Sequence, residues 1–203
     1  MSDRDAILAR VRAASPRRAP HPGVYVPPPL ACDWETFADA LRSAGGEPVG
    51  PVARSALAAE VARACAAGAS GGRVVAVGPA VDALGAGPWR ALADDVDPRT
   101  LGDVEVAILT GSLGIAENGA VALDGRHARV RALPFLCERL VLLLDARALV
   151  PDLHAAIARM PAEATGWHHY TWISGPSKTA DIEQSLVFGA HGPRTCAVVG
   201  VAD

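Results

Sequence analysis

The sequence predicts an α/β fold of three layers, built on a largely parallel central sheet. Two continuous apolar runs rich in β-branched residues, Arg73–Gly78 and Val104–Thr110, are typical of strands buried on both faces. Stretches with apolar residues at helical spacing alternate with such runs, which is typical of a parallel sheet covered by helices. Of the 203 residues, 50% are hydrophobic, so one domain can bury a substantial core.

Residues 1–30 predict an N-terminal appendage, and we expect the α/β domain to span residues 31–203. Ser2–Ala14 has the spacing of an amphipathic helix, which must pack on the domain or on another subunit because so short a helix is marginal alone. Ser15–Leu30 is rich in proline and is typical of an extended linker. Asp33 is the expected N-cap of a second helix, which ends at a pair of glycines.

The remaining elements alternate between helices and strands. From the spacing of their apolar residues we expect helices at Val52–Ala67, Trp89–Asp95 and Val150–Met160. Short apolar runs predict four more strands, at Ala120–Leu123, Leu140–Leu144, Tyr170–Ser174 and Ala197–Val201, the last of which closes the sheet. Asp124-Gly125 is typical of a hairpin turn and leads to a further stretch at Ala128–Ala132.

Charge and hydropathy exclude several classes of protein. The net charge of −3 argues against a general nucleic-acid binder. A basic cluster lies near the start, and we interpret it as a solvated arm; it consists of Arg10, Arg12, Arg17 and Arg18. No apolar run approaches the roughly 18 residues that span a bilayer, and Met1–Pro20 lacks the apolar segment of a secretory signal. We therefore expect a cytoplasmic protein that binds neither nucleic acid nor a membrane.

The cysteines predict no metal site. No two of them have the spacing of a metal-ligand pair; they are Cys32, Cys65, Cys137 and Cys196. Disulfides are rare in a reducing cytoplasm, so most of these residues are expected to be buried free thiols. We expect this chain to hold no cofactor and no iron–sulfur cluster of its own.

A stretch near the C-terminus, Ile173–Glu183, has the pattern of a loop that leads into a helix. Two turn formers precede Ser177, Lys178 and Thr179, and apolar residues then follow at helical spacing. Free N–H groups at a helix start carry partial positive charge, so these hydroxyls and the ammonium group could hold a phosphate or a carboxylate. The alternative is an ordinary capped helix start, with Asp181 and Gln184 as a pair that resembles a capping box.

A glycine-rich segment follows the predicted strand that ends at Thr110. Ligands of open α/β sheets bind beyond the carboxyl ends of the strands, so we expect this segment and the C-terminal loop to converge in one anion-binding crevice. The residues predicted to bind the anion are Thr110, Gly111, Ser112, Gly114, Ser174, Gly175, Ser177, Lys178 and Thr179. The alternative for the glycines is a purely structural role in sharp turns.

Two segments of the C-terminal half resemble a known family. The run ISGPSKTADIEQSLVFGAHGPR at Ile173–Arg194 and the run GSLGIAENGAVALDG at Gly111–Gly125 are similar to the signatures of the lactate utilization protein C family, the LUD-domain proteins. The resemblance implies a fold like that of the sugar-phosphate isomerase and CoA-transferase group. It also implies a role in oxidising L-lactate to pyruvate beside partner subunits that carry iron–sulfur clusters, with a small anionic metabolite as ligand.

Glu117 and His191 are the two candidate catalytic residues. The family more often has Glu-Thr-Gly where this chain has Glu117-Asn118-Gly119, and the departure makes the triplet similar to the nucleophile motif of class I CoA-transferases, although Ala116 replaces the serine. A carboxylate can attack an acyl group when nearby donors stabilise the charge. The alternative is that Glu117 accepts backbone N–H bonds and Asn118 is left-handed.

His191 is placed to act as a base, because imidazole is the usual proton acceptor near neutral pH and lactate oxidation requires one. A turn histidine bonded to local backbone is the alternative. Two further functions also stay open: an acyl-CoA transferase or sugar-phosphate enzyme that uses Glu117, and a scaffold without catalysis whose N-terminal helix docks on partner subunits.

Overall fold

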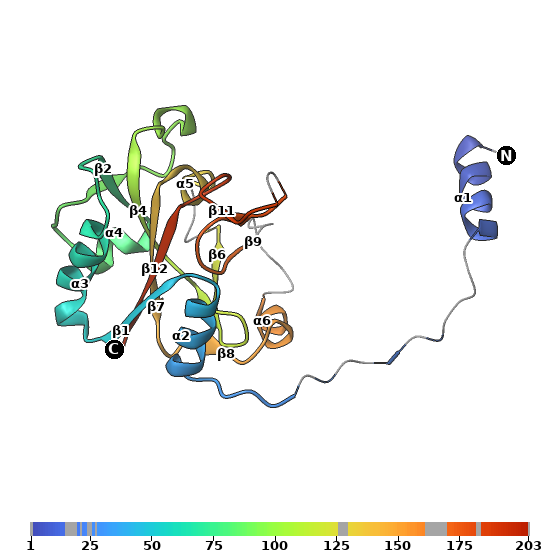
Figure 1. Ribbon diagram of the computed structural model, residues 1–203, viewed down its shortest axis with the longest axis horizontal. Helices are drawn as coiled ribbons and strands as arrows, with labels where there is room; N and C mark the ends of the chain where they lie inside the picture. The colour runs from blue at the N-terminus through green and yellow to red at the C-terminus, as the bar shows by residue number, and fades with distance from the viewer. Residues whose placement is uncertain are drawn as a thin grey trace.

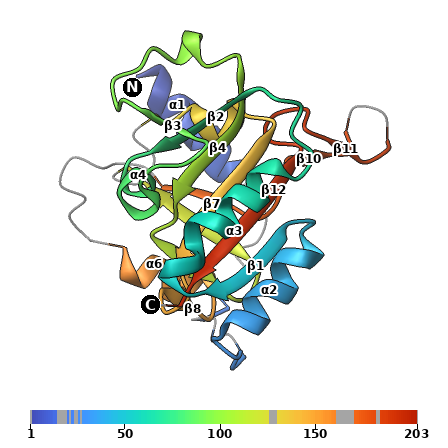
Figure 2. The same ribbon diagram turned by 90° about the vertical axis from the view of Figure 1, so that its left-hand side faces the viewer.

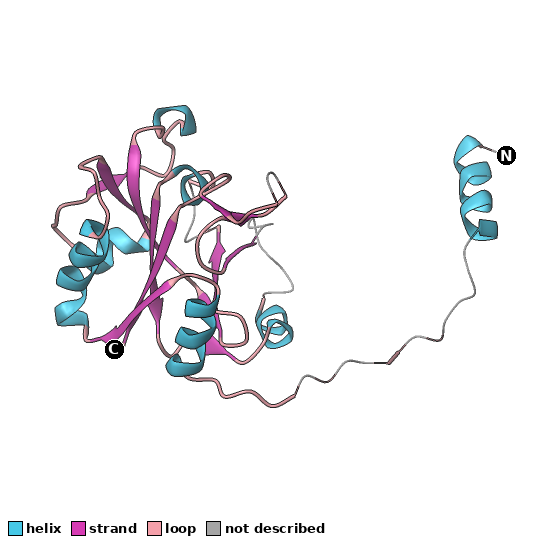
Figure 3. Ribbon diagram, viewed as in Figure 1, coloured by secondary structure: helices cyan, strands magenta, loops and turns pink. Residues whose placement is uncertain are grey.

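The chain folds into three layers, and the predicted α/β class is confirmed. The computed structural model describes residues 2–14, 20, 22–23, 26, 28–125, 130–160, 170–181 and 184–202. A parallel sheet forms the middle layer, with two helices on one face and a mixed layer of helix and sheet on the other (Figure 1). Figure 3 shows the strands gathered between the helices.

All pairs in the six-stranded sheet are parallel. In spatial order its strands are β1 (Glu47–Val52), β12 (Thr195–Val201), β7 (Arg139–Asp145), β4 (Val104–Thr110), β2 (Arg73–Val77) and β3 (Arg90–Leu92). The expectation that the last strand closes the sheet is wrong, because β12 lies between β1 and β7. The edge strand β1 was not predicted, since it contains Pro48, Gly50 and Pro51, and proline is tolerated in strands chiefly at sheet edges.

The large sheet buries side chains on both faces. Val106 and Ile108 of β4 belong to the core shared with the helices α3 (Arg54–Ala66) and α4 (Pro79–Leu84). Ala107 and Leu109 of the same strand point to the core on the opposite face. In Figure 2 the helix α3 lies in front of the sheet. Burial on both faces explains why this run is continuously apolar rather than alternating.

A second, smaller sheet lies against the opposite face. Its order is β8 (Leu149–Val150), β5 (Leu113–Ile115), β6 (Ala120–Asp124) and β9 (Tyr170–Ile173). The antiparallel pairs β5–β6 and β6–β9 hold it together. The strands predicted at Ala120–Leu123 and Tyr170–Ser174 therefore belong to this separate layer and not to the parallel sheet.

Helix boundaries follow the capping residues. The helix α2 (Trp34–Ser43) begins at the N-cap Asp33, whose carboxylate accepts the Thr36 N–H at 2.8 Å. Asp152 caps α6 (Leu153–Arg159) in the same way. The other described helices are α1 (Asp3–Ala14), α5 (Leu133–Leu136) and the 3-10 turn η1 (Pro98–Thr100).

The helix expected at Trp89–Asp95 is wrong. The chain instead forms α4 before it and the edge strand β3 within it. Trp89 is largely buried and donates its indole N–H to the Gly85 carbonyl at 3.0 Å, while Arg90–Leu92 pairs with β2. A window of seven residues does not separate a short helix from a short strand by periodicity alone. The stretch expected at 128–132 falls partly outside the described residues.

The N-terminal helix α1 stands apart from the other elements in Figure 1. None of its residues is buried, and Ile7 and Val11 keep 60% and 57% of their surface exposed. Its packing on a partner stays a prediction. Within the described residues, no helix is both long enough and apolar enough to cross a membrane.

The thiols differ sharply in accessibility, which gives a first testable prediction. Burial raises the pKa of Cys65 to about 11 and the pKa of Cys137 and Cys196 to about 12, whereas Cys32 is exposed. Because the thiolate is the reactive form, we expect only Cys32 to react with an aromatic disulfide reagent in the native protein. The other three should react after unfolding in denaturant. More than one fast-reacting thiol in the native chain would contradict this arrangement.

Candidate functional site

The C-terminal signature forms a hairpin and not a helix. The strands β10 (Lys178–Thr179) and β11 (Val187–Phe188) pair antiparallel, so the helix start expected after Ser174 is absent from the described part of this stretch. Gly189 and Gln184 adopt positive φ angles of 80° and 55°, which a helix does not allow. Ile182 and Glu183 lie outside the described residues. An anion at this loop would therefore not be held by a helix N-terminus.

The signature loop is anchored on the C-terminal end of α2. Gly175 has a φ of 73°, and a Cβ there would lie 2.8 Å from the carbonyl oxygen of Ala44, so only glycine allows this approach. The ammonium group of Lys178 donates a hydrogen bond to the same carbonyl oxygen. A cation at a helix C-terminus complements the helix dipole, so Lys178 also stabilises α2.

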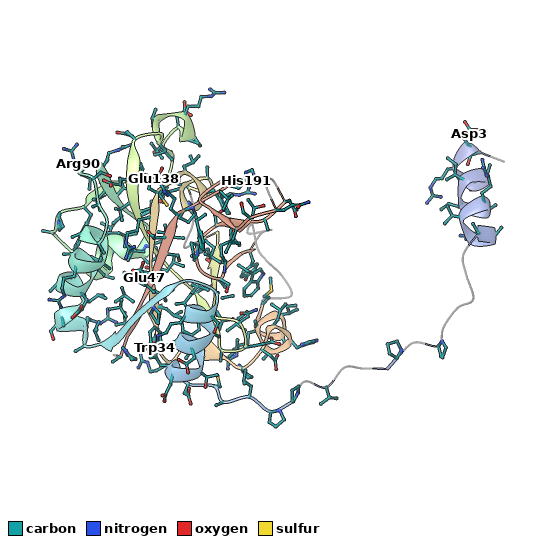
Figure 4. The ribbon with its side chains drawn as sticks, viewed as in Figure 1. Asp3, Trp34, Glu47, Arg90, Glu138 and His191 are labelled. Atoms are coloured by element: carbon teal, nitrogen blue, oxygen red, sulfur yellow. The ribbon has the colours of Figure 1, made fainter. Side chains whose placement is uncertain are left out.

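The loop encloses a cavity of about 270 Å³, which we call the signature cavity. Five of the predicted site residues line it together: Ser174, Gly175, Ser177, Lys178 and His191. Thr179 belongs to β10 and does not line it. The cavity thus joins the loop after β9 to the turn before β12, and Figure 4 labels His191 on the same side of the domain as the hairpin.

The polar groups of the signature cavity include one permanent cation. Lys178 is exposed, and its ammonium has three N–H donors, of which the α2 carbonyl uses one. It is also the only lysine among the 19 lysine and arginine residues of the chain. The backbone N–H of His191 donates to Ser177 Oγ at 3.4 Å, and its exposed side chain shares the cavity wall with Lys178. The ammonium group, the imidazole and the Ser177 hydroxyl are groups suited to bind a small carboxylate.

The glycine-rich segment does not converge with the signature loop in one pocket, so that expectation is corrected. Thr110 lines a cleft at the carboxyl edge of the large sheet, and Ser112 lines a third cavity of about 290 Å³ on the outer face of the small sheet. The two segments touch elsewhere, because Ser174 Oγ donates to the carbonyl of Asn118 at 2.6 Å. Thr110 and Ser112 line different cavities because Thr110 ends β4 of the large sheet, whereas β5 and β6, which follow, belong to the small sheet.

Packing explains the glycines at 111 and 114. A Cβ at Gly111 would lie 2.2 Å from Val121, and one at Gly114 would lie 2.6 Å from Leu149. Gly111 also donates its N–H to the Leu143 carbonyl at 2.8 Å, which joins the ends of β4 and β7. Neither glycine lines the signature cavity or the cleft at the carboxyl edge. Their ligand role stays a prediction.

Glu117 lies at the start of α6. Its Oε2 accepts the N–H of Leu153 at 3.2 Å, and it lines none of the three cavities that hold other predicted site residues. Asn118 Oδ1 accepts the Ala120 N–H at 3.0 Å. The left-handed residue of this turn is Gly119, with a φ of 65°, and not Asn118 as the structural alternative supposed. The carboxylate thus has a structural partner, and covalent catalysis by Glu117 stays a hypothesis.

The cleft at the carboxyl edge, hereafter the carboxyl-edge cleft, was only partly foreseen. It has a volume of about 360 Å³, and besides Thr110 it is lined by the charged residues Arg54, Asp82 and Asp145. Hydrogen bonds from Arg147, with a further contribution from the charge of Arg54, hold the pKa of Asp145 below its usual range. The sequence signal that could have indicated these residues was their position, because Asp145 directly follows the predicted strand Leu140–Leu144 and Asp82 follows the predicted strand Arg73–Gly78.

Among the described residues, no group of three His, Cys, Asp or Glu side chains could hold a metal ion. His168 and His169, which precede β9, lie outside the described residues.

Comparisons with known proteins agree with the C-terminal signatures. The family model described as the LUD domain matches residues 89–201. "Lactate utilization protein C" of Geobacillus kaustophilus is 34% identical over 102 residues, covering 48% of this chain and 42% of that protein. The protein of the same name from Deinococcus radiodurans is 32% identical over 122 residues, covering 56% of this chain and 58% of that protein. The chain spans about half the length of the relatives it matches.

A solved structure shares the fold. It is the crystal structure of a DUF162 family protein from Deinococcus radiodurans, with a TM-score of 0.59 at 20% sequence identity. The similarity covers 83% of this chain and 95% of that one, so it includes elements that precede the segment matched by the family model.

Proposed function

Because this chain belongs to the LUD domain family, whose model matches residues 89–201, we propose that it takes part in lactate utilisation and binds a small 2-hydroxy or 2-keto acid in the signature cavity. The relatives named lactate utilization protein C support the metabolic role. The observation that carries the site is the convergence of Lys178, His191 and two serines on one cavity of about 270 Å³.

Each group has a role in this proposal. The ammonium of Lys178 pairs with the carboxylate of the ligand, since two of its three donors remain after the bond to Ala44. Ser177 lines the cavity and its hydroxyl can donate to the 2-oxygen of the ligand, whereas Ser174, whose proton is bonded to the Asn118 carbonyl, can only accept from a 2-hydroxyl group. His191 accepts the hydroxyl proton when a 2-hydroxy acid is oxidised.

Oxidation of lactate to pyruvate breaks the O–H bond and the Cα–H bond, and so releases two protons and two electrons. We assign the role of electron acceptor to iron–sulfur clusters in partner subunits, which the family resemblance implies. This chain would present the bound acid to those subunits. The site residues described above bind and orient the ligand and take one proton. In this proposal the assembled system, and not this chain, takes the hydrogen of the Cα–H bond as one proton and two electrons.

The first test is binding to the isolated chain, measured as thermal unfolding against L-lactate, pyruvate and inorganic phosphate. A ligand at about 100 times its dissociation constant stabilises by about 2.7 kcal/mol, so a clear rise in melting temperature is expected with lactate and pyruvate. Lys178→Gln should abolish the rise, because the amide keeps donors for the Ala44 carbonyl but lacks the charge. Lys178→Arg should retain part of it.

A matched pair of serine variants locates the ligand. Ser177→Ala removes a hydroxyl from the signature cavity, whereas Ser112→Ala removes one from the cavity on the outer face of the small sheet. We expect a weaker response only for Ser177→Ala. Equal responses of wild type and Lys178→Gln to lactate would rule out the signature cavity as the site.

A further inference from the structure

We propose that the carboxyl-edge cleft is a second ligand site, one that binds the ammonium group of a small aliphatic amine or amino acid. The cleft lies on the face of the large sheet that α3 and α4 cover, since Leu57, Leu143 and Val201 in its wall belong to that core. The signature cavity includes Ile173, which packs against the core on the other face. The proposal is independent of lactate binding.

The cleft lies at the point of the large sheet where the order of the strands reverses direction. From β2 the chain passes outward to β3, whereas after β4 it continues to β7 and β12 on the other side. The connections that follow β2 and β4 therefore run in opposite directions, which is the usual location of ligands in open α/β sheets. The residues that end β4 and β7, Thr110 and Asp145, both line the cleft.

Thr110 supplies a polar atom that requires an explanation. Its Oγ1 is buried and has no hydrogen-bond partner among the described residues. Buried hydroxyls in folded proteins are nearly always paired, so an unpaired hydroxyl on a residue that lines a cleft indicates a missing partner. The side chain follows Val106 and Ile108 at a spacing of two, so it points to the same face as the cleft.

The charges of the cleft select the ligand. Asp145 is held by three hydrogen bonds from Arg147 and is also near the charge of Arg54, so its carboxylate is compensated. Asp82 has no hydrogen-bond or ion-pair partner among the described residues of the chain. The acceptors without a protein partner are thus the exposed carboxylate of Asp82 and the hydroxyl of Thr110. Because Thr110 Oγ1 is shielded from solvent, the Thr110 side chain would have to rotate about χ1 to meet an ammonium group in the cleft.

The apolar wall specifies the rest of the ligand. Leu57, Ala83 and Val201 offer hydrocarbon surface beside the polar groups, in a cleft of about 360 Å³. An ammonium group on a short branched chain matches both parts. A simple amine and an amino acid share this chemistry, and titration with both distinguishes them.

The experiment uses the full chain and three probes that share the 3-methylbutyl chain: L-leucine, 3-methylbutylamine and 2-hydroxy-4-methylpentanoate. Calorimetric titration should detect binding of one or both ammonium probes, and tighter binding of leucine would identify the amino acid as the source. The hydroxy acid, which lacks the ammonium group, should not bind at this cleft. Binding of the hydroxy acid that persists in Lys178→Gln, or no binding of either ammonium probe, would overturn the proposal.

Variants then place the probe. Asp82→Asn should weaken binding of the ammonium probe at least tenfold, because it removes the negative charge, and Thr110→Val should weaken it severalfold, because it removes the hydroxyl acceptor; both replacements keep the shape of the side chain. Asp95→Asn neutralises an exposed carboxylate outside the cleft lining and should leave the affinity unchanged. Lys178→Gln should also leave it unchanged, so failure of the lactate site and failure of this site are distinguishable. Unaltered affinity in Asp82→Asn would exclude the assignment.

Discussion

Gly119→Ala is expected to destabilise the fold by at least about 3 kcal/mol. Gly119 has a φ of 65°, and a Cβ there would lie 2.4 Å from the backbone nitrogen of Leu41 and 2.5 Å from its Cα. Leu41 is fully buried in the core under α2, so the helix itself would have to move. The left-handed backbone alone costs an alanine about 1–2 kcal/mol, and the clash adds to this. Denaturant unfolding followed by circular dichroism measures the loss.

Gly68→Ala is the matched control, which measures the cost of the left-handed backbone without a steric clash. Gly68 has a similar φ of 79°, but a Cβ there would have no heavy atom within 4 Å. We expect a loss of only about 1–2 kcal/mol for this variant. If the two variants were equally destabilised, the close contact between the Glu117–Gly119 turn and α2 would not be a constraint on this fold.

Glu47→Ala is expected to cost about 2–3 kcal/mol. Arg139 is only 6% exposed in its side chain, and it donates to both carboxylate oxygens of Glu47, at 3.0 and 2.5 Å. Removing the acid leaves a charged guanidinium in a nearly buried position, with the Ala64 carbonyl as its remaining acceptor at 2.6 Å. The value is at the low end for buried pairs because Glu47 is 48% exposed and water can reach the gap.

Two comparisons isolate the buried charge as the cause. Asp39→Ala breaks the ion pair with Arg42, whose side chains are 70% and 59% exposed, and should cost less than about 1 kcal/mol. The double variant Glu47→Ala/Arg139→Met should recover part of the loss, because no unpaired charge remains. A double variant that is less stable than Glu47→Ala would point to packing of the arginine stem instead. Chemical unfolding of all four chains provides the numbers.

The sequence predicted the central strands well for a physical reason. Residues of β4 and β7 are buried on both faces, so nearly every position must be apolar and the run is visible without knowledge of its neighbours. Helix starts at Asp33 and Asp152 were equally predictable, because the cap bonds form between residues three apart in the chain. Short edge strands such as β1 and β3 lack such a local signal, since their pairing partners are distant.

The signature loop shows what a local pattern misses. The spacing of Ile182, Leu186 and Val187 fits a helix, yet the chain forms a hairpin anchored on Ala44, more than a hundred residues earlier. The structure brings Ser174, Gly175, Ser177 and Lys178 together with His191 at one cavity, and it places Thr110 and Ser112 at other cavities, which corrects the expected convergence of the two segments. Ligand binding at these residues stays a prediction, for which the lactate titration is the test.

The sequence by itself determined the α/β class, the buried strands, the helix caps and, through its two signatures, the family. Those features depend on interactions between near neighbours or on residue types that repeat along a run. Tertiary structure alone decided that β12 lies inside the sheet, that Glu117 meets α6, and that the two signatures line separate cavities. Each of these rests on contacts between distant segments, which are set by how whole layers pack and which no short stretch of sequence encodes.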